Sequence, residues 1–312
     1  MKIISLMPVK NEEWILNLSL RQLSEISDEV IILNDNSSDK TTEVAKVYKN
    51  CTVLDYKEKE NFVNMSRRRN VLLEQGRKMG GTHFVMLDAD ECFSDDFQKD
   101  IRNTLSKLSK GQALCLPWTF VFKYGEQIVI DPKLSIIKDF IFCDDGVSLY
   151  EDKALSEGRT PAIRNNYVIE ENKKFAVYHF QYYAEKRNQL KQIWYRCNEL
   201  IEGKRSAYRI NATYLFTKTF KPQQIINVDD AYIKANLSSI KNSDDKFLLK
   251  RITDLFDLYG IKFFEKLDIW YMKETMDIFI NEMKRDPKPS IPSKIIMLVN
   301  EYKNIILNKI IK

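Results

Sequence analysis

The chain has 312 residues, and 44% of them are hydrophobic, enough to bury the core of a large α/β domain with an extension. Its 49 Lys and Arg residues and 44 Asp and Glu residues give a formal charge of +5, with the two signs interspersed. Nucleic-acid-binding proteins concentrate positive charge on one face or segment, so this pattern speaks against a nucleic-acid partner.

The five cysteines are far apart and include no Cys-x-x-Cys pair; they are Cys51, Cys92, Cys115, Cys143 and Cys197. We expect ordinary core residues rather than a disulfide framework or a zinc site. A strand-like run begins at Lys2, and no apolar run is long enough to cross a bilayer. These features predict a cytoplasmic protein.

The first hundred residues alternate between strand and helix patterns. Strands are predicted at 2–7, 29–33, 52–54 and 83–87, and helices from Asn11, at 41–48 and at about 62–79. Ser94 has the features of an N-cap, since Asp95 and Asp96 follow it in the first helical turn. This β-α-β-α order predicts a mostly parallel sheet with helices on both faces.

Short strands are predicted between residues 113 and 142, including a hairpin around Gly125, and a long loop region is predicted over 143–172. A strand at 175–180 and a helix at 184–201 follow. Beyond Gly203 the patterns are mainly helical. We therefore predict an α/β domain over residues 1–205 and a helical extension over residues 206–312.

The strongest chemical signal is Asp88-Ala89-Asp90-Glu91, at the end of an apolar strand. Ligands of open α/β sheets bind at the carboxyl ends of the strands. Alternate residues of an extended strand share a face, so Asp88 and Asp90 can project toward one point, and Ala89 is small enough to let a ligand approach the backbone. Two carboxylates suit Mg²⁺ or Mn²⁺ with phosphate oxygens as further ligands. An acidic loop that caps the next helix explains this motif equally well.

Two other kinds of ligand site fit poorly. An EF-hand would need an oxygen ligand where Cys92 stands, and no glycine follows it. A Rossmann or P-loop site would need a glycine-rich turn after the first strand, which the sequence lacks.

Several motifs occur in a definite order: Pro8-Val9-Lys10-Asn11-Glu12, Asn34 to Thr41, Arg69-Asn70, and Asp88 to Glu91. This order resembles the family 2 glycosyltransferases of the GT-A fold, most closely the branch with lipopolysaccharide-core and related cell-envelope enzymes. The resemblance covers residues 1–100 well and residues 175–200 loosely. It implies a Rossmann-like GT-A domain that binds a nucleotide-sugar donor together with Mn²⁺ or Mg²⁺.

The family's residue roles carry over by position in the motifs. The resemblance places Pro8, Val9, Asn11, Glu12, Asn34 and Asp35 at the base and ribose, Arg69 and Asn70 at the phosphates or sugar, Asp88 and Ala89 at the ribose or metal, and Asp90 as the main metal ligand. One departure is Asn34, since the family usually has Asp at that position. An amide can still hydrogen-bond to a base or a hydroxyl.

Family members often place a histidine near the position of His179, which suggests that His179 completes the metal shell or binds diphosphate. His83, inside a strand, is expected to be structural. An inverting transferase also needs a carboxylate base. The candidates lie in the predicted loop region and are Asp144, Asp145, Glu151, Asp152 and Glu157. Asp144 and Asp145 are favoured because they follow a strand-like run, and Glu157 precedes Gly158-Arg159-Thr160-Pro161.

The last predicted helix begins at about Ser293 and mixes Ile and Leu with Lys294, Lys303, Lys309 and Lys312. Packing against the protein is favoured over peripheral contact with the inner face of the cell membrane, but the pattern fits both.

The sequence therefore predicts an enzyme that transfers a hexose-type sugar, expected to be UDP-linked, to a glycan, lipid-linked or other acceptor. A sugar-1-phosphate nucleotidyltransferase is a rival, although residues 7–13 lack the glycine-rich signature of those enzymes. An inactive glycosyltransferase-like binding protein is a second rival. The oligomeric state is left open.

Overall fold

A computed structural model describes residues 1–57, 65–124, 127–151, 158–161, 166–219 and 224–288. The chain divides into two compact units. The first consists of Met1–Ala184 with Pro222–Ser243, and the second of Glu185–Lys221 with Asp244–Lys312.

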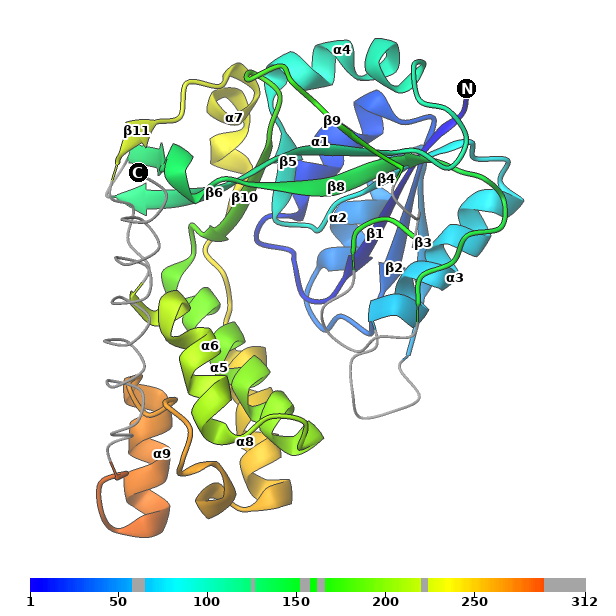
Figure 1. Cartoon of the computed structure of the whole chain (residues 1–312). Helices are drawn as coiled ribbons and strands as arrows, with labels where there is room; N and C mark the ends of the chain where they lie inside the picture. The colour runs from blue at the N-terminus through cyan, green and yellow to red at the C-terminus, as the bar shows by residue number, and fades with distance from the viewer. Residues whose placement is uncertain (58–64, 125–126, 152–157, 162–165, 220–223, 289–312) are drawn as a thin grey trace, which may run out of the picture. The chain divides into compact units, whose positions relative to one another are not determined.

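The first unit is built on parallel strands joined by helices (Figure 1). In chain order its first elements are β1 (Ile3–Val9), α1 (Leu16–Ile26), β2 (Glu29–Asn34), α2 (Thr41–Lys46), β3 (Cys51–Asp55), α3 (Met65–Lys78) and β4 (His83–Met86). Strand β1 pairs in parallel with β2 and β4, and β2 pairs in parallel with β3. The predicted β-α-β order and the α/β fold are confirmed.

Alternation along the buried strands creates one apolar core on each face of this sheet. On one face, Ile3 and Met7 of β1 pack with Leu16 and Leu20 of α1. On the other face, Leu6 packs with side chains of α3 and β4 such as Leu72 and Phe84. Helices therefore cover both faces, as a parallel sheet requires.

The sheet continues beyond β4 with mostly antiparallel strands: β5 (Glu91–Phe93), β6 (Ala113–Tyr124), β7 (Gln127–Ile130), β8 (Ile136–Cys143), β9 (Tyr167–Ile169), β10 (Val177–Tyr182) and β11 (Ile226–Asn227). The predicted hairpin is present as the antiparallel pair β6–β7. Strand β8 connects the two parts of the sheet, because it pairs antiparallel with both β4 and β6.

Of two predicted helix starts, one is confirmed and one is wrong. Ser94 caps α4 (Asp95–Leu105) as predicted, since its Oγ accepts a hydrogen bond from Phe97 N. Helix α1 begins at Leu16, five residues after the predicted start at Asn11. Asn11 itself has a left-handed backbone with φ 54°, which a helix excludes.

The second unit is helical and contains α5 (Glu185–Glu202), α6 (Ala207–Thr219), α8 (Lys246–Tyr259), the 3₁₀ turn η3 (Ile261–Phe264) and α9 (Lys273–Met283). Arg196 of α5 is fully buried, and its guanidinium donates to the carbonyls of Asp268 and Tyr214. Helix α8 buries one apolar face, with Leu248, Ile252 and Phe256.

The division between the units falls at Glu185 and not at the predicted residue 205. Helix α5 packs on α6 and α8, so it belongs with the helices that follow it. The segment Pro222–Ser243 belongs to the first unit, because β11 pairs with β7, and α7 (Ala231–Asn236) packs against α4.

Among the described residues, no helix is long and apolar enough to span a membrane. The helix predicted from Ser293, with its lysines and the membrane contact suggested for it, lies outside the described residues.

The contact between α3 and β4 depends on a glycine. A Cβ built on Gly76 would lie 2.5 Å from Cε1 of Phe84, whose ring is fully buried and packs on Phe142. We expect Gly76→Ala to destabilise the protein, because overpacking costs about 1–3 kcal/mol and outweighs the roughly 1 kcal/mol gained in helix propensity. Urea unfolding measures the effect.

A double-mutant cycle checks that cause. In a Phe84→Leu background, where the ring is absent, Gly76→Ala should be neutral or stabilising. The same loss of stability in both backgrounds would show that the Phe84 contact is not responsible.

Candidate active site

The polar motifs meet at one edge of the sheet. In the parallel register Val9 pairs with Asn34, and Asn34 pairs with Asp55, so β1, β2 and β3 end together. Strand β4 runs parallel beside β1 and leads into Asp88. The motifs recognised in the sequence are therefore gathered at the carboxyl edge of the parallel strands, where open α/β sheets bind ligands.

Two loops at this edge are connected by hydrogen bonds between side chains and backbone. Asn11 Oδ1 accepts from Ser38 N at 2.7 Å, and Asn11 N donates to Ser37 Oγ at 2.9 Å. Glu12 N donates to Thr41 Oγ1, and the Glu12 carboxylate accepts from Trp14 Nε1. Asn11 and Glu12 thus hold the loop after β1 against the loop after β2.

Asp35 is buried at this edge between two cations. Its Oδ2 lies 3.1 Å from Lys10 Nζ and 2.6 Å from Arg68 Nη2. Asn34 is also buried; its amide donates to Asp55 Oδ1 and accepts from Ser37 N. An Asp at position 34 would face the Asp55 carboxylate, so the amide avoids a like-charge contact and explains the departure from the family pattern.

Asp88 is paired with a buried arginine. Arg159 Nη2 lies 2.8 Å from Asp88 Oδ2 and 2.5 Å from Glu91 Oε1. Glu91 is fully buried and also accepts from Trp118 Nε1 and from the Asp88 backbone N–H, both at 2.8 Å. Burial raises the pKa of Glu91, and Arg159 opposes that rise. Burial disfavours the charged form of Arg159, but Asp88 and Glu91 outweigh it and raise its pKa.

Asp90 faces His179. The distance between Asp90 Oδ2 and His179 Nε2 is 3.5 Å, and both side chains are buried. The imidazole stacks on the Trp118 indole, with ring centroids 4.5 Å apart and planes 16° apart. Because β10 pairs with β5 and β6, the same sheet fixes both the ring and the carboxylate.

The predicted metal ligands thus have different partners: Asp88 pairs with Arg159, whereas Asp90 and His179 face each other. Asp90 and His179 present an oxygen and a nitrogen to each other and fit one divalent ion, which can keep its other positions for water or phosphate. Asp88 is neutralised by Arg159, which makes it a poorer ligand and a better hydrogen-bond acceptor. Among the described residues, no group of three or more His, Cys, Asp or Glu side chains is arranged to hold a metal.

Lys138 of β8 belongs to the same surface but was not predicted. Its Nζ lies 4.4 Å from the centroid of the Trp118 ring, and burial followed by the charge of Arg159 lowers its pKa. The sequence held one signal, since Lys138 and Asp139 interrupt the apolar run from Ile136 to Phe142. Arg159 stands in the segment after the candidate base Glu157, but only the fold brings it to Asp88.

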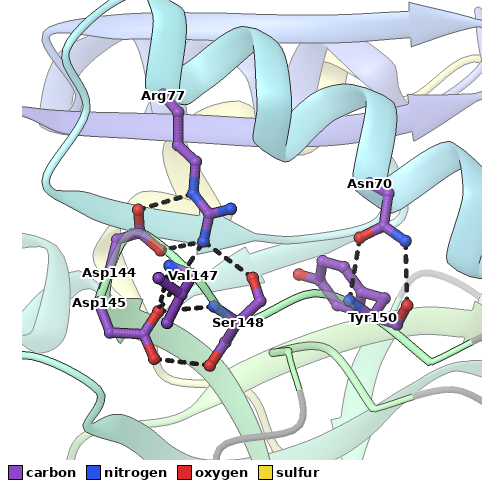
Figure 2. Close-up of polar contacts among 7 residues, drawn as sticks. All are labelled: Asn70, Arg77, Asp144, Asp145, Val147, Ser148 and Tyr150. Atoms are coloured by element: carbon purple, nitrogen blue, oxygen red, sulfur yellow. Dashed lines mark hydrogen bonds and ion pairs between the residues drawn. The ribbon is translucent and has the colours of Figure 1, made fainter.

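Asn70 and Arg69 contact a loop of the protein instead of pointing freely into the site. Figure 2 shows Asn70 facing the backbone of Tyr150; its amide donates to the carbonyl at 3.0 Å and accepts from the N–H at 2.9 Å. Arg69 donates to the Gly158 carbonyl. The Tyr150 hydroxyl in turn donates to the Arg159 carbonyl at 2.8 Å. Both residues of the motif therefore hold the chain that carries Arg159.

Asp144 and Asp145 lie at the other edge of the sheet, so the prediction that one of them is the catalytic base is corrected. Cys143 pairs with His83, where β4 begins, whereas Asp88 follows the end of β4, roughly 16 Å away at the rise of a strand. Figure 2 shows their actual partners. Arg77 forms a two-point ion pair with Asp144, and Asp145 accepts from Val147 N, Ser148 N and Ser148 Oγ.

The other predicted residues are placed as follows. Val9 and Ala89 are buried in the core beneath the edge, and Pro8 is half-buried. His83 is buried beside Thr82, its pKa lowered by burial, in agreement with a structural role. All five cysteines are free thiols. Glu157 lies outside the described residues.

Removing Arg159 leaves two carboxylates without their cation. We expect Arg159→Met to lower the free energy of unfolding by about 3–5 kcal/mol, because Glu91 would be buried and uncompensated. Adding Glu91→Gln should recover part of that loss. Denaturant unfolding of both variants measures it, and Arg102→Met, which removes an exposed pair with Asp28, is the control at under about 1 kcal/mol. Equal stabilities of Arg159→Met and the control would contradict the pairing.

Comparison with known proteins supports the motif reading of the first unit. Residues 5–129 match the family model described as Glycosyl transferase family 2. Among solved structures, the chain resembles Staphylococcus aureus TarS 1–349 with 14% identity and a TM-score of 0.41, covering 91% of this chain and 92% of that one. Glucosyl-3-phosphoglycerate synthase from Mycobacterium tuberculosis, solved with Mn²⁺ and UDP-glucose, has 17% identity and a TM-score of 0.28, covering 40% and 45%.

These structural similarities are too low to carry an argument about function, and no curated protein sequence matches the chain. The segment that matches the family model runs from within β1 to within β7. It therefore includes the four sequence motifs, from Pro8 to Glu91, that lie at or near the carboxyl edge of the sheet.

Proposed function

We propose that the protein is a family 2 glycosyltransferase that takes its sugar from a nucleotide diphosphate donor. The observation that carries this proposal is the meeting of Asn11, Asp35, Asp88 and Asp90 at one sheet edge, within the segment that matches the family model. The charges at this edge suit a donor with a polar base, a ribose and an anionic diphosphate.

The proposed donor site assigns different roles to the residues of the edge. Asn34 and Asp35, held by Asp55 and by Lys10 with Arg68, lie where a base or ribose hydroxyl would hydrogen-bond. Asp88 would accept from a ribose hydroxyl, since Arg159 fixes its carboxylate. A uracil base is our expectation from the family resemblance.

Asp90 and His179 would hold Mn²⁺ or Mg²⁺. When bound, such an ion neutralises the charge that develops on a departing diphosphate. The protein contributes position: the Trp118 ring fixes the imidazole, and pairing of β5 with β10 brings Asp90 to it. Both ligands are buried, which limits competition from solvent.

The acceptor is proposed from the resemblance alone, as a cell-envelope glycan or a lipid-linked sugar on the cytoplasmic side of the membrane. Inversion at the anomeric carbon would need a base. With Asp144 and Asp145 at the opposite edge, we propose Glu157 from among the other predicted bases, because it precedes Gly158, whose carbonyl accepts from Arg69.

Binding experiments separate this function from its rivals. We expect UDP with Mn²⁺ to raise the melting temperature more than UTP does, and more than UDP in EDTA does, in a panel that includes GDP, CDP and ADP. A preference for a triphosphate would favour a sugar-1-phosphate nucleotidyltransferase. No stabilisation by any nucleotide would favour a binding protein without catalysis and would overturn the proposal.

The metal site has its own test. Asp90→Asn should reduce metal-dependent hydrolysis of the donor sugar about 100-fold or more, because several kcal/mol of charge stabilisation depend on the ion. Asp96→Asn, an exposed carboxylate in the first turn of α4, should have no effect. Turnover in the presence and absence of Mn²⁺ measures both. Full activity of Asp90→Asn with an unchanged requirement for Mn²⁺ would rule out the proposed ligand.

A further inference from the structure

Lys138 and Arg159 form a cationic pair beside Asp88. Both lie over the Trp118 indole, with Lys138 Nζ 4.4 Å and the Arg159 guanidinium carbon 5.8 Å from the ring centroid. They come from different parts of the chain: Lys138 from β8, and Arg159 from the segment that Asn70 and Tyr150 hold in place. No sequence motif contains both residues, so only the fold brings them together.

Strand register places Lys138 on the face of the sheet that carries the metal pair. Trp118 of β6 pairs with Ile136 of β8 and with Val177 of β10. Lys138 and His179 are each two residues beyond those partners, so they share the face of Trp118. Trp118 thus lies on a strand between Lys138 and His179, and the indole N–H to Glu91 fixes its ring.

Both cations have spare capacity for an anion. Arg159 is 3% exposed, and its Nη2 serves Asp88 and Glu91, whereas its Nη1 is buried with no hydrogen-bond partner in the described part of the chain. Lys138 Nζ has the Trp118 ring but no carboxylate within ion-pair distance among the described residues. Unsatisfied buried donors are costly, so an anion that meets them is stabilised.

The electrostatics point the same way. Burial lowers the pKa of Lys138, and the charges of Arg159 and Arg69 lower it further, whereas Glu91 and Asp88 oppose that shift. Burial and then Arg159 likewise lower the pKa of Arg69. A ligand with negative charge would relieve the repulsion among these cations that the two carboxylates leave. Phosphate suits this site, because several oxygens can accept from both an ammonium and a guanidinium.

We propose that Lys138 Nζ and Arg159 Nη1 form a phosphate-binding subsite, and that this subsite receives the diphosphate of the donor. The assignment to the donor rests on the proposed function. The subsite lies beside the metal pair rather than within it, so the two share the diphosphate charge. Nucleoside diphosphate binding therefore keeps a component that does not depend on metal.

The test measures binding of uridine, UMP and UDP by calorimetry in EDTA, with the full chain. The variant is Lys138→Met, which keeps the apolar stem on Trp118 and removes the charge. We expect about tenfold or more weaker UDP binding, the loss expected for one charge-assisted hydrogen bond, and unchanged uridine binding. Lys138→Arg should retain UDP affinity. Lys133→Met, an exposed lysine just before β8, is the matched control.

A second comparison separates this subsite from the metal site. Asp90→Asn should lose the gain in UDP affinity that Mn²⁺ gives and keep the affinity measured in EDTA, and Lys138→Met should show the reverse. Arg159→Lys tests the second cation and is preferred to Arg159→Met, which would leave Glu91 buried without a cation.

Two results would overturn the inference. Wild-type UDP affinity of Lys138→Met in EDTA would remove the subsite, and equal losses for uridine and UDP would indicate only a structural role. If wild type binds no nucleoside diphosphate with or without Mn²⁺, the proposed function itself fails, which is distinguishable from normal UDP binding that is insensitive to Lys138.

Discussion

The buried carboxylate of Glu91 is the constraint around which the candidate site is arranged. An ionised carboxylate without exposure needs a cation and hydrogen-bond donors, and Arg159, Trp118 and the Asp88 backbone N–H supply them. Because the same guanidinium also pairs with Asp88, one ion-pair cluster fixes the acidic motif, the indole and the loop that carries Arg159. The arrangement of these side chains therefore follows from the need to pair the Glu91 carboxylate when folding buries it.

Helix α3 connects this cluster to the rest of the sheet. Leu72 and Leu73 of this helix pack in the core beside β1 and β4. One turn earlier, Arg68 pairs with Asp35, and Asn70 fixes Tyr150 and through it the Arg159 backbone. Asn70, which the family resemblance assigns to the donor, thus holds the frame of the proposed donor site, a role that sequence motifs cannot distinguish from direct contact.

The different roles proposed for Asp88 and Asp90 follow from the different partners of the two carboxylates. Asp88 has a permanent cation, so it would gain less from an added metal, whereas Asp90 faces an imidazole, which in its neutral form can ligate a metal. Lys138, over the Trp118 ring, brings further positive charge to the same face. A diphosphate bound there would meet fixed cations as well as an ion, and positioned charges need no reorganisation when the leaving group departs.

The strands of the parallel sheet and the acidic edge were predictable from local sequence. Continuous apolar runs indicated β1, β2 and β4, Ser94 indicated the start of α4, and the ends of the strands placed Asp35, Asp88 and Asp90 at one edge, because these features depend on neighbours in the chain.

Which residues face one another follows only from the folded chain. Asp144 lies at the opposite edge, because the antiparallel pairing of β8 with β4 is a long-range register that local patterns do not encode. The fold places it there. It also brought Arg159 to Asp88 and Lys138 to Trp118. Only packing chooses the partner of a buried charge, because the cost of leaving that charge unpaired arises once the surrounding segments have excluded water.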